Sequence, residues 1–244
     1  MSTTLDGIFI TLKNKGKVFN MTVAVCFFGL PRSYEQWKDK FGKFYEGCEV
    51  DFYAHFWKDS SFNQEDLNQK FNFKKLLVHE QKKDFIKLPK ITDLTKTTKG
   101  VFSTLSPLFS MKMVGEIIEE IEEDYDFFII TRTDVGCNSN TKLIDFELDC
   151  DKFYTSYVRG NEWLNTHLDA KWLCGNKKKI SELCSVYDNL TKYIVEDKIP
   201  LCHHRLFFHA LKEYKDSMEM LNVDPSYSLA GGWFFMRNGR ITKS

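Results

Sequence analysis

The chain has 244 residues, which is long enough to bury a substantial core and favours one large domain. Its 34 basic and 34 acidic residues balance, so the overall charge gives no reason to expect nucleic acid or an anionic membrane as the principal partner. Seven cysteines without any CxxC spacing exclude a CxxC zinc or redox motif and indicate scattered thiols in a reducing, cytoplasmic compartment. No apolar run approaches the roughly 20 residues that span a bilayer, so we expect no transmembrane segment.

The first elements follow one another closely. Residues 1–20 are expected to be an N-terminal appendage, and the domain is expected to cover 21–244. The apolar run 22–28 predicts a buried strand, closed by a loop at Gly29–Arg32. A capping box that starts at Ser33 then predicts a helix with an aromatic face reaching Tyr45. Arg32 would lie at the helix N-terminus, where backbone N–H groups favour an anion.

Further along the chain, strands are expected to alternate with helices. Ser106 and Pro107 have the types expected for the N-cap and first residue of a helix that reaches about residue 123. The remaining pattern predicts strands at 50–57, 76–78, 127–132, 153–157 and 171–174, a long loop at 80–100, helices at 180–194 and 206–214, and an Asn-Gly hairpin over 234–241. This alternation predicts an α/β fold with a mixed sheet.

The run from 126 to 135 carries the strongest functional signal. A short apolar strand ends there in Arg132 and Asp134. Ligands of open α/β sheets bind at the carboxyl ends of the strands, so this pair can hold a diphosphate directly or through a divalent cation. The alternative is a structural ion pair at a strand end. The literal DxD at Asp124 and Asp126 precedes the strand and is interpreted as a turn at the opposite sheet edge.

Three common nucleotide and hydrolase signatures are absent from the sequence. It contains no GxxxxGK[ST], no GxGxxG and no GxSxG motif. Their absence argues against a P-loop NTPase, a dinucleotide-binding Rossmann enzyme and an α/β-hydrolase.

Three blocks, at 23–32, 50–57 and 125–134, resemble a group of glycosyltransferase-like proteins of phages, large viruses and bacteria. Those proteins are similar to GT-A nucleotide-sugar transferases, and the resemblance extends over roughly residues 21–215. It implies a single GT-A-like (Rossmann-like) domain with a mixed, mostly parallel sheet flanked by helices. It also implies a nucleotide-binding part at about 21–135, an acceptor-side part at about 136–244, and sugar transfer from a nucleotide-sugar donor to a glycan, lipid or protein acceptor.

The resemblance also implies roles for individual residues. It places Gly29, Pro31 and Arg32 beside the nucleotide, together with Asp51 at the start of the second strand and Arg132 on the diphosphate. Asp134 occupies the place of the last carboxylate of the DxD motif of GT-A enzymes, and would bind Mn²⁺ or Mg²⁺ with help from another group. In the alternative reading, Arg132 supplies the positive charge and no metal is needed.

Transfer by an inverting route also needs a general base on the acceptor side. Asp169 is the preferred candidate, with Glu162 and His167 as alternatives. His55 is interpreted as a structural histidine and Trp57 as core or rim packing. The adjacent His203 and His204 point about 100° apart on a helix, which argues against a shared metal and favours a polar helix N-terminus.

Two other functions remain open from the sequence. The missing first aspartate of the DxD motif makes a catalytically inactive homologue that binds a nucleotide or glycan a credible alternative. A structural or partner-binding viral protein, acting in the host cytoplasm, is the second.

Overall fold

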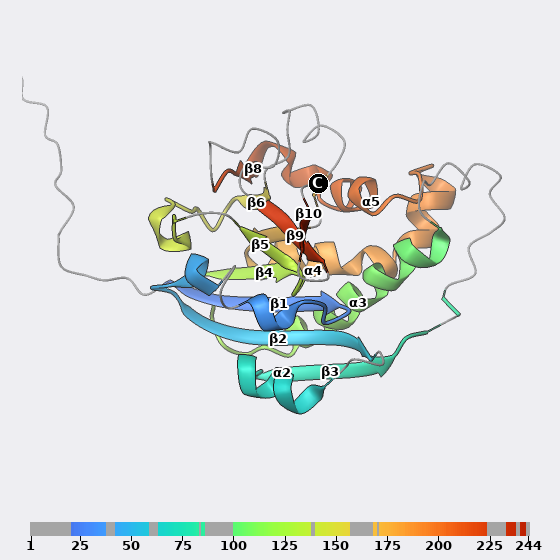
Figure 1. Ribbon diagram of the computed structural model, residues 1–244. Coiled ribbons are helices and arrows are strands. Elements are labelled where there is room, and N and C mark those ends of the chain that lie inside the picture. Colours follow the sequence, from blue (N-terminus) through green and yellow to red (C-terminus); the bar gives the residue numbers. More distant parts are fainter. Residues whose placement is uncertain are drawn as a thin grey trace, which may run out of the picture.

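The computed structural model of the protein describes residues 21–37, 42–58, 63–82, 84–85, 100–137, 140–156, 168–169, 171–223, 233–237 and 240–242. These residues form an α/β domain in which helices flank a mixed, mostly parallel sheet (Figure 1). The fold class expected from the sequence is therefore confirmed. The appendage at 1–20 and most of the loop at 80–100 lie outside the described residues.

The main sheet has seven strands in the order β3-β2-β1-β4-β7-β6-β8. Their bounds are Thr22–Gly29 for β1, Glu49–Lys58 for β2, Lys75–Glu80 for β3, Phe127–Thr131 for β4, Phe153–Ser156 for β6, Trp172–Gly175 for β7 and Met218–Leu221 for β8. β7 runs antiparallel to its neighbours β4 and β6, and the other pairs are parallel. The chain runs outward from β1 through β2 to β3 and returns to form β4 on the other side of β1. The boundary between β1 and β4 is therefore a topological switch point.

A second sheet joins β5 (Val135–Cys137), β9 (Trp233–Arg237) and β10 (Arg240–Thr242) in the order β10-β9-β5. β9 and β10 pair antiparallel with Arg237 opposite Arg240, so the predicted hairpin is confirmed. The sequence pattern missed β5 and β8, which have only three and four residues. β6 and β7 are as short as β8 but contain aromatic residues typical of strands, whereas β8 reads Met-Glu-Met-Leu and β5 has a central glycine.

Both faces of the main sheet are covered, which explains why its central strands are continuously apolar. Alternate residues of β1 enter two cores: Ala24, Cys26 and Phe28 face one, and Val23, Val25 and Phe27 face the other. The first core contains α3 (Val101–Glu119), α4 (Lys177–Cys184) and α5 (His203–Ala210). The second contains α2 (Gln64–Phe71), two 3₁₀ turns and the small sheet.

The region after β1 is described only in part. Tyr34–Gln36 and Gly42–Tyr45 are 3₁₀ turns, residues 38–41 between them lie outside the described residues, and Ser33 adopts a left-handed φ of 55° without the predicted side-chain capping bond. Trp37 stacks on Tyr45 with ring centroids 5.8 Å apart. Burial of these aromatic rings against the sheet outweighs the local capping signal, because a capping bond stabilises by only about 1 kcal/mol.

α3 begins at Val101, ahead of the predicted start at Ser106, and Pro107 lies inside it. Thr104 and Leu105 are buried in the core, so burial favours extending the helix before the proline. The two C-terminal helices also end earlier than predicted: α4 continues as a 3₁₀ turn at Ser185–Tyr187 and a π-helix at Lys192–Glu196, and α5 as a 3₁₀ helix at Lys212–Ser217.

α3 is also long and apolar enough, by length and composition alone, to cross a membrane. The prediction that no apolar run approaches that length therefore missed this 19-residue helix. In the folded domain 56% of its apolar window is buried, and its side chains pack against β1, β2 and β4. α3 is the central core helix of a globular domain.

Candidate active site

Arg132 and Asp134 form a bidentate ion pair where β4 ends. Arg132 Nε donates to Asp134 Oδ1 at 2.8 Å, and Nη2 donates to Oδ2 at 2.5 Å. The Asp134 side chain is fully buried, whereas 28% of the Arg132 side chain is exposed. Both carboxylate oxygens are thus engaged by the guanidinium, which remains partly accessible from outside.

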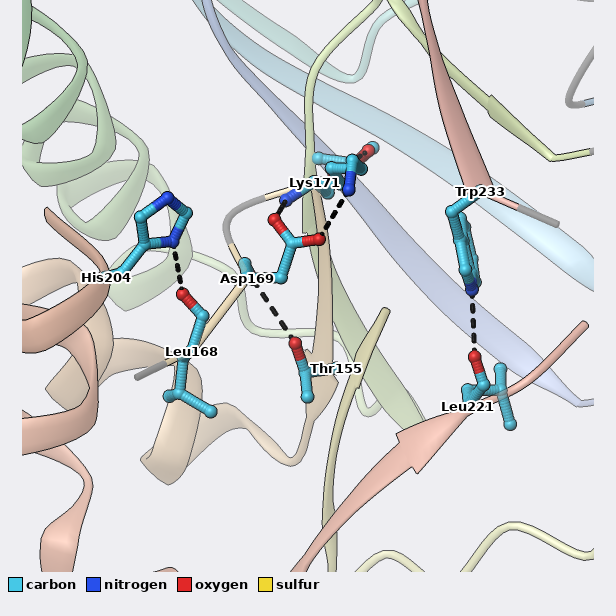
Figure 2. A network of polar contacts seen from close by, with 8 residues as sticks. Thr155, Leu168, Asp169, Lys171, His204, Leu221 and Trp233 are labelled. Carbon is cyan, nitrogen blue, oxygen red and sulfur yellow. Dashed lines mark hydrogen bonds and ion pairs between the residues drawn. The ribbon is translucent and has the colours of Figure 1, made fainter. Parts of the chain in front are cut away.

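Asp169 forms a second ion pair, with Lys171. The Lys171 Nζ lies 2.7 Å from Asp169 Oδ2, and the Lys171 backbone N–H donates to Oδ1 at 3.3 Å (Figure 2). Both side chains are more than nine-tenths buried. Thr155 Oγ1 donates to the Asp169 carbonyl at 3.2 Å, which ties this short segment to β6.

Leu168, the residue before Asp169, is held by α5. Its N–H donates to the His204 carbonyl at 3.0 Å. Figure 2 shows the second bond, in which His204 Nδ1 donates to the Leu168 carbonyl at 2.6 Å. The His203 and His204 rings lie 4.0 Å apart. His204 therefore fixes the backbone beside Asp169.

The two ion pairs lie side by side because β4 and β7 are antiparallel neighbours. Thr131 pairs with Trp172, and Thr131 Oγ1 donates to the Lys171 carbonyl at 2.9 Å. The Phe235 ring, on β9, lies 5.2 Å from Arg132 Cζ and 5.5 Å from Lys171 Nζ. We call these five residues, Arg132, Asp134, Asp169, Lys171 and Phe235, the paired-charge cluster.

Three members of the cluster were candidates from the sequence alone: Arg132, Asp134 and Asp169. Lys171 and Phe235 were missed. A signal for Lys171 existed, because Asp169 and Lys171 repeat the two-residue spacing of Arg132 and Asp134 with the charges reversed. Nothing in the local sequence singles out Phe235, which reaches the cluster only through pairing of β9 with β5.

The loop after β1 lies beside the cluster at the same sheet edge. β1 and β4 are parallel and end together, and Thr133 Oγ1 donates to the Arg32 carbonyl at 2.9 Å. Gly29 has a φ of +94°, a conformation that other residues rarely adopt, and it turns the chain out of the sheet. Pro31 is buried and Arg32 is exposed, so the Arg32 side chain faces solvent beside the switch point.

A buried hydrogen-bonded network, formed by residues of α3 and β2, holds this loop in place. The Gly29 N–H donates to Ser110 Oγ at 2.8 Å, and the same oxygen lies 2.6 Å from His55 Nδ1. His55 Nε2 lies 3.0 Å from Nδ1 of the exposed His79. Burial, and then the neighbouring His79 and Lys82, lower the pKa of His55 to about 3. His55 is therefore a neutral structural histidine, and Trp57 is a core residue that is 1% exposed.

Asp51 does not join this site, contrary to the prediction that it contacts the nucleotide. It pairs with Ala24 near the beginning of β1 and accepts a hydrogen bond from Tyr125 at 2.6 Å. The start of a parallel strand lies at the edge opposite its carboxyl end, which accounts for this placement. Asp126 also lies at that edge and accepts from the Thr22 N–H at 2.7 Å, as expected for a turn residue.

The cluster does not fit a divalent cation as arranged. Both oxygens of Asp134 accept from Arg132, and both oxygens of Asp169 accept from Lys171. Within the part of the chain that the structure describes, three possible ligands come close enough together to share an ion at Asp149, Cys150 and Asp151, which are exposed and lie elsewhere. A metal at Asp134 would have to displace a guanidinium from a buried carboxylate.

The engagement of Asp169 also argues against its predicted role as the general base. A base must reach the acceptor hydroxyl, whereas the Asp169 side chain is only 8% exposed and both of its oxygens accept from Lys171. The other two candidates, Glu162 and His167, lie outside the described residues.

Comparison with known proteins adds no family. No protein-family model matches this chain, and no curated protein matches it.

Proposed function

We propose that the protein is a nucleotide-sugar-dependent glycosyltransferase of GT-A type. The observation that carries the proposal is the meeting of the Gly29–Arg32 loop and Arg132 at the topological switch point between β1 and β4. Open α/β sheets bind their ligands in this position. A nucleotide lying across the switch point would contact both Arg32 and Arg132.

The chemistry follows from the charge that develops on the donor. When the bond between the sugar and the diphosphate breaks, negative charge accumulates on the leaving phosphate oxygen. A guanidinium held in place by a carboxylate stabilises that charge without having to reorganise. Arg132, anchored on Asp134, has this arrangement. Arg32 adds an accessible positive charge next to it.

A second candidate function is a homologue that binds the donor or a glycan without turnover. It is favoured by the engagement of both Asp169 oxygens, which leaves the described residues without an identified acceptor-side base. A structural or partner-binding role, in which both ion pairs only stabilise the sheet edge, is the third reading.

A binding panel separates these three functions. UDP-, GDP-, CMP- and dTDP-sugars are added singly, with EDTA or with Mn²⁺, and thermal unfolding and release of the nucleotide are measured. A ligand at 100 times its dissociation constant stabilises the fold by about 2.7 kcal/mol. We expect one nucleotide to stabilise the protein and to be released from its sugar. Binding without release would indicate the inactive homologue, and no binding by any nucleotide would overturn the nucleotide-sugar proposal.

Arg32 provides the variant for this panel because its side chain is exposed and Arg32→Ala should leave the fold intact. We expect Arg32→Ala to weaken nucleotide binding by roughly tenfold, the size of one charge-assisted contact. Lys74→Ala is the matched control: it removes an exposed lysine near Asp51, at the opposite sheet edge. Equal affinities in both variants would contradict the placement of the nucleotide.

The cellular setting belongs to the same proposal. All seven cysteines lie among the described residues and are free, which supports a reducing compartment such as the cytoplasm, of the host if the protein is viral. The acceptor is proposed to be a glycan, lipid or protein, and nucleic acid is not the expected partner.

A further inference from the structure

The cations of the paired-charge cluster have hydrogen-bond donors to spare. A guanidinium carries five N–H groups, and Arg132 uses two on Asp134. An ammonium carries three, and Lys171 uses one on Asp169. The Lys171 side chain is only 5% exposed. Within the described residues the other N–H groups of Lys171 have no acceptor, and because buried donors are normally satisfied, they point to a ligand.

Phe235 brings the two cations to one place. The face of its ring attracts Arg132 and Lys171 alike, at 5.2 Å and 5.5 Å from the ring centre. An oxyanion lying between the two cations would accept hydrogen bonds from both.

The carboxylates hold the two cations but leave some of their N–H groups available to a ligand. Asp134 is bound through Nε and Nη2, which leaves the Nη1 side of the guanidinium for a second bidentate partner. Each ion pair is neutral, so the attraction between its two charges offsets the cost of removing them from water when the protein folds. Arg32, exposed next to Thr133, contributes the net positive charge that draws an anion to this edge.

We infer that Arg132 and Lys171 form a cradle for a diphosphate that works without a divalent cation, with Lys171 as its second phosphate-binding residue. This inference rests on the proposed function in taking the diphosphate to be that of the nucleotide donor. In this arrangement Asp169 positions the Lys171 ammonium and does not act as a general base. The positive charges of Lys171 and Arg132 take over the role of the metal that the resemblance implied.

The test uses inorganic pyrophosphate as the probe, with isothermal titration calorimetry in EDTA and again with Mn²⁺. Removing Lys171 alone would strand the buried Asp169, so the test variant is the double substitution Lys171→Met with Asp169→Asn. The control is Lys152→Met with Glu219→Gln, which neutralises another lysine–carboxylate pair (2.5 Å) at the beginning of β6, on the opposite sheet edge. Lys171→Arg keeps the charge and the pair.

The unsubstituted protein and the control are expected to bind pyrophosphate in EDTA with equal affinity. The Lys171 double variant should bind roughly tenfold to hundredfold more weakly, the size of one or two charge-assisted hydrogen bonds, and Lys171→Arg should restore most of the affinity. Binding that appears only with Mn²⁺, or that is unchanged in the double variant, would overturn the cradle.

The two proposals fail in different ways. Pyrophosphate binding in EDTA without release of any nucleotide from its sugar would support the cradle while refuting the transferase. Nucleotide release that depends on Mn²⁺ and is indifferent to Lys171 would refute the cradle and leave the transferase standing.

Discussion

Ser110→Ala should be among the most damaging single substitutions, although it removes only one oxygen atom. Ser110 is fully buried in α3. Its hydroxyl accepts from the Gly29 N–H at 2.8 Å and lies 2.6 Å from His55 Nδ1 and 3.1 Å from the His55 carbonyl. One proton arrangement satisfies every group: Gly29 and His55 Nδ1 donate to the oxygen, and its hydrogen goes to the His55 carbonyl.

The magnitude follows from what the alanine leaves behind. Each buried polar group without a partner costs about 1–3 kcal/mol, and Ser110→Ala strands two: the Gly29 N–H and His55 Nδ1. Gly29 is half-buried, so water can compensate part of its loss. We therefore expect a loss of about 2–4 kcal/mol. For a chain of this length the loss corresponds to a fall in Tm of roughly 5–12 °C.

The assay is urea denaturation followed by tryptophan fluorescence, with thermal unfolding as a second probe. Ser103→Ala is the matched control, because Ser103 lies on the same helix but is exposed and donates only to the Gly100 carbonyl. It should change the free energy of unfolding by less than about 0.5 kcal/mol. If Ser110→Ala and Ser103→Ala unfold at the same urea concentration, the buried network does not stabilise the loop after β1.

Three further predictions test the same edge and the opposite one. The pKa of His55 lies near 3 in the folded protein and near 6.5 when unfolded, so only the unfolded chain gains this proton as pH falls. His55 should therefore remove about 2 kcal/mol of stability between pH 7 and pH 5, and urea titrations of His55→Asn should lack that component. Gly29→Ala should cost about 1–2 kcal/mol, measured by the same titration, because its φ of +94° strains any side chain although the space beyond is open. Asp126→Ala should cost about 1–2 kcal/mol by thermal unfolding, since Asp126 accepts from both the N–H and the hydroxyl of Thr22, and an unchanged Tm would contradict this.

The local sequence pattern was sufficient to predict the central strands of the main sheet. The runs at 22–28, 50–57 and 127–132 are observed as Thr22–Gly29, Glu49–Lys58 and Phe127–Thr131. A strand covered on both faces is apolar at every position, and turn residues mark its ends, so neither signal depends on the strand's neighbours.

Local pattern failed where a segment's neighbours decide its conformation. The capping box predicted at Ser33 does not form: residues 34–36 adopt a 3₁₀ turn, and Trp37 stacks on Tyr45 in the core. Pro107 has the type of a helix start, yet burial of Leu105 extends α3 ahead of it. In each case the burial of large side chains outweighed a local preference of about 1 kcal/mol.

The same division holds for the candidate site. The sequence by itself determined that Arg132 and Asp134 end a buried strand, because they are two residues apart and follow an unmistakable apolar run. Only the tertiary structure decided that Asp51 lies at the far edge, that Asp169 is bound to Lys171, and that Phe235 lies against both cations. These contacts join segments of distant sequence whose meeting depends on strand order and direction. Periodicity along one segment carries information about which face is buried, but none about which strand lies beside it.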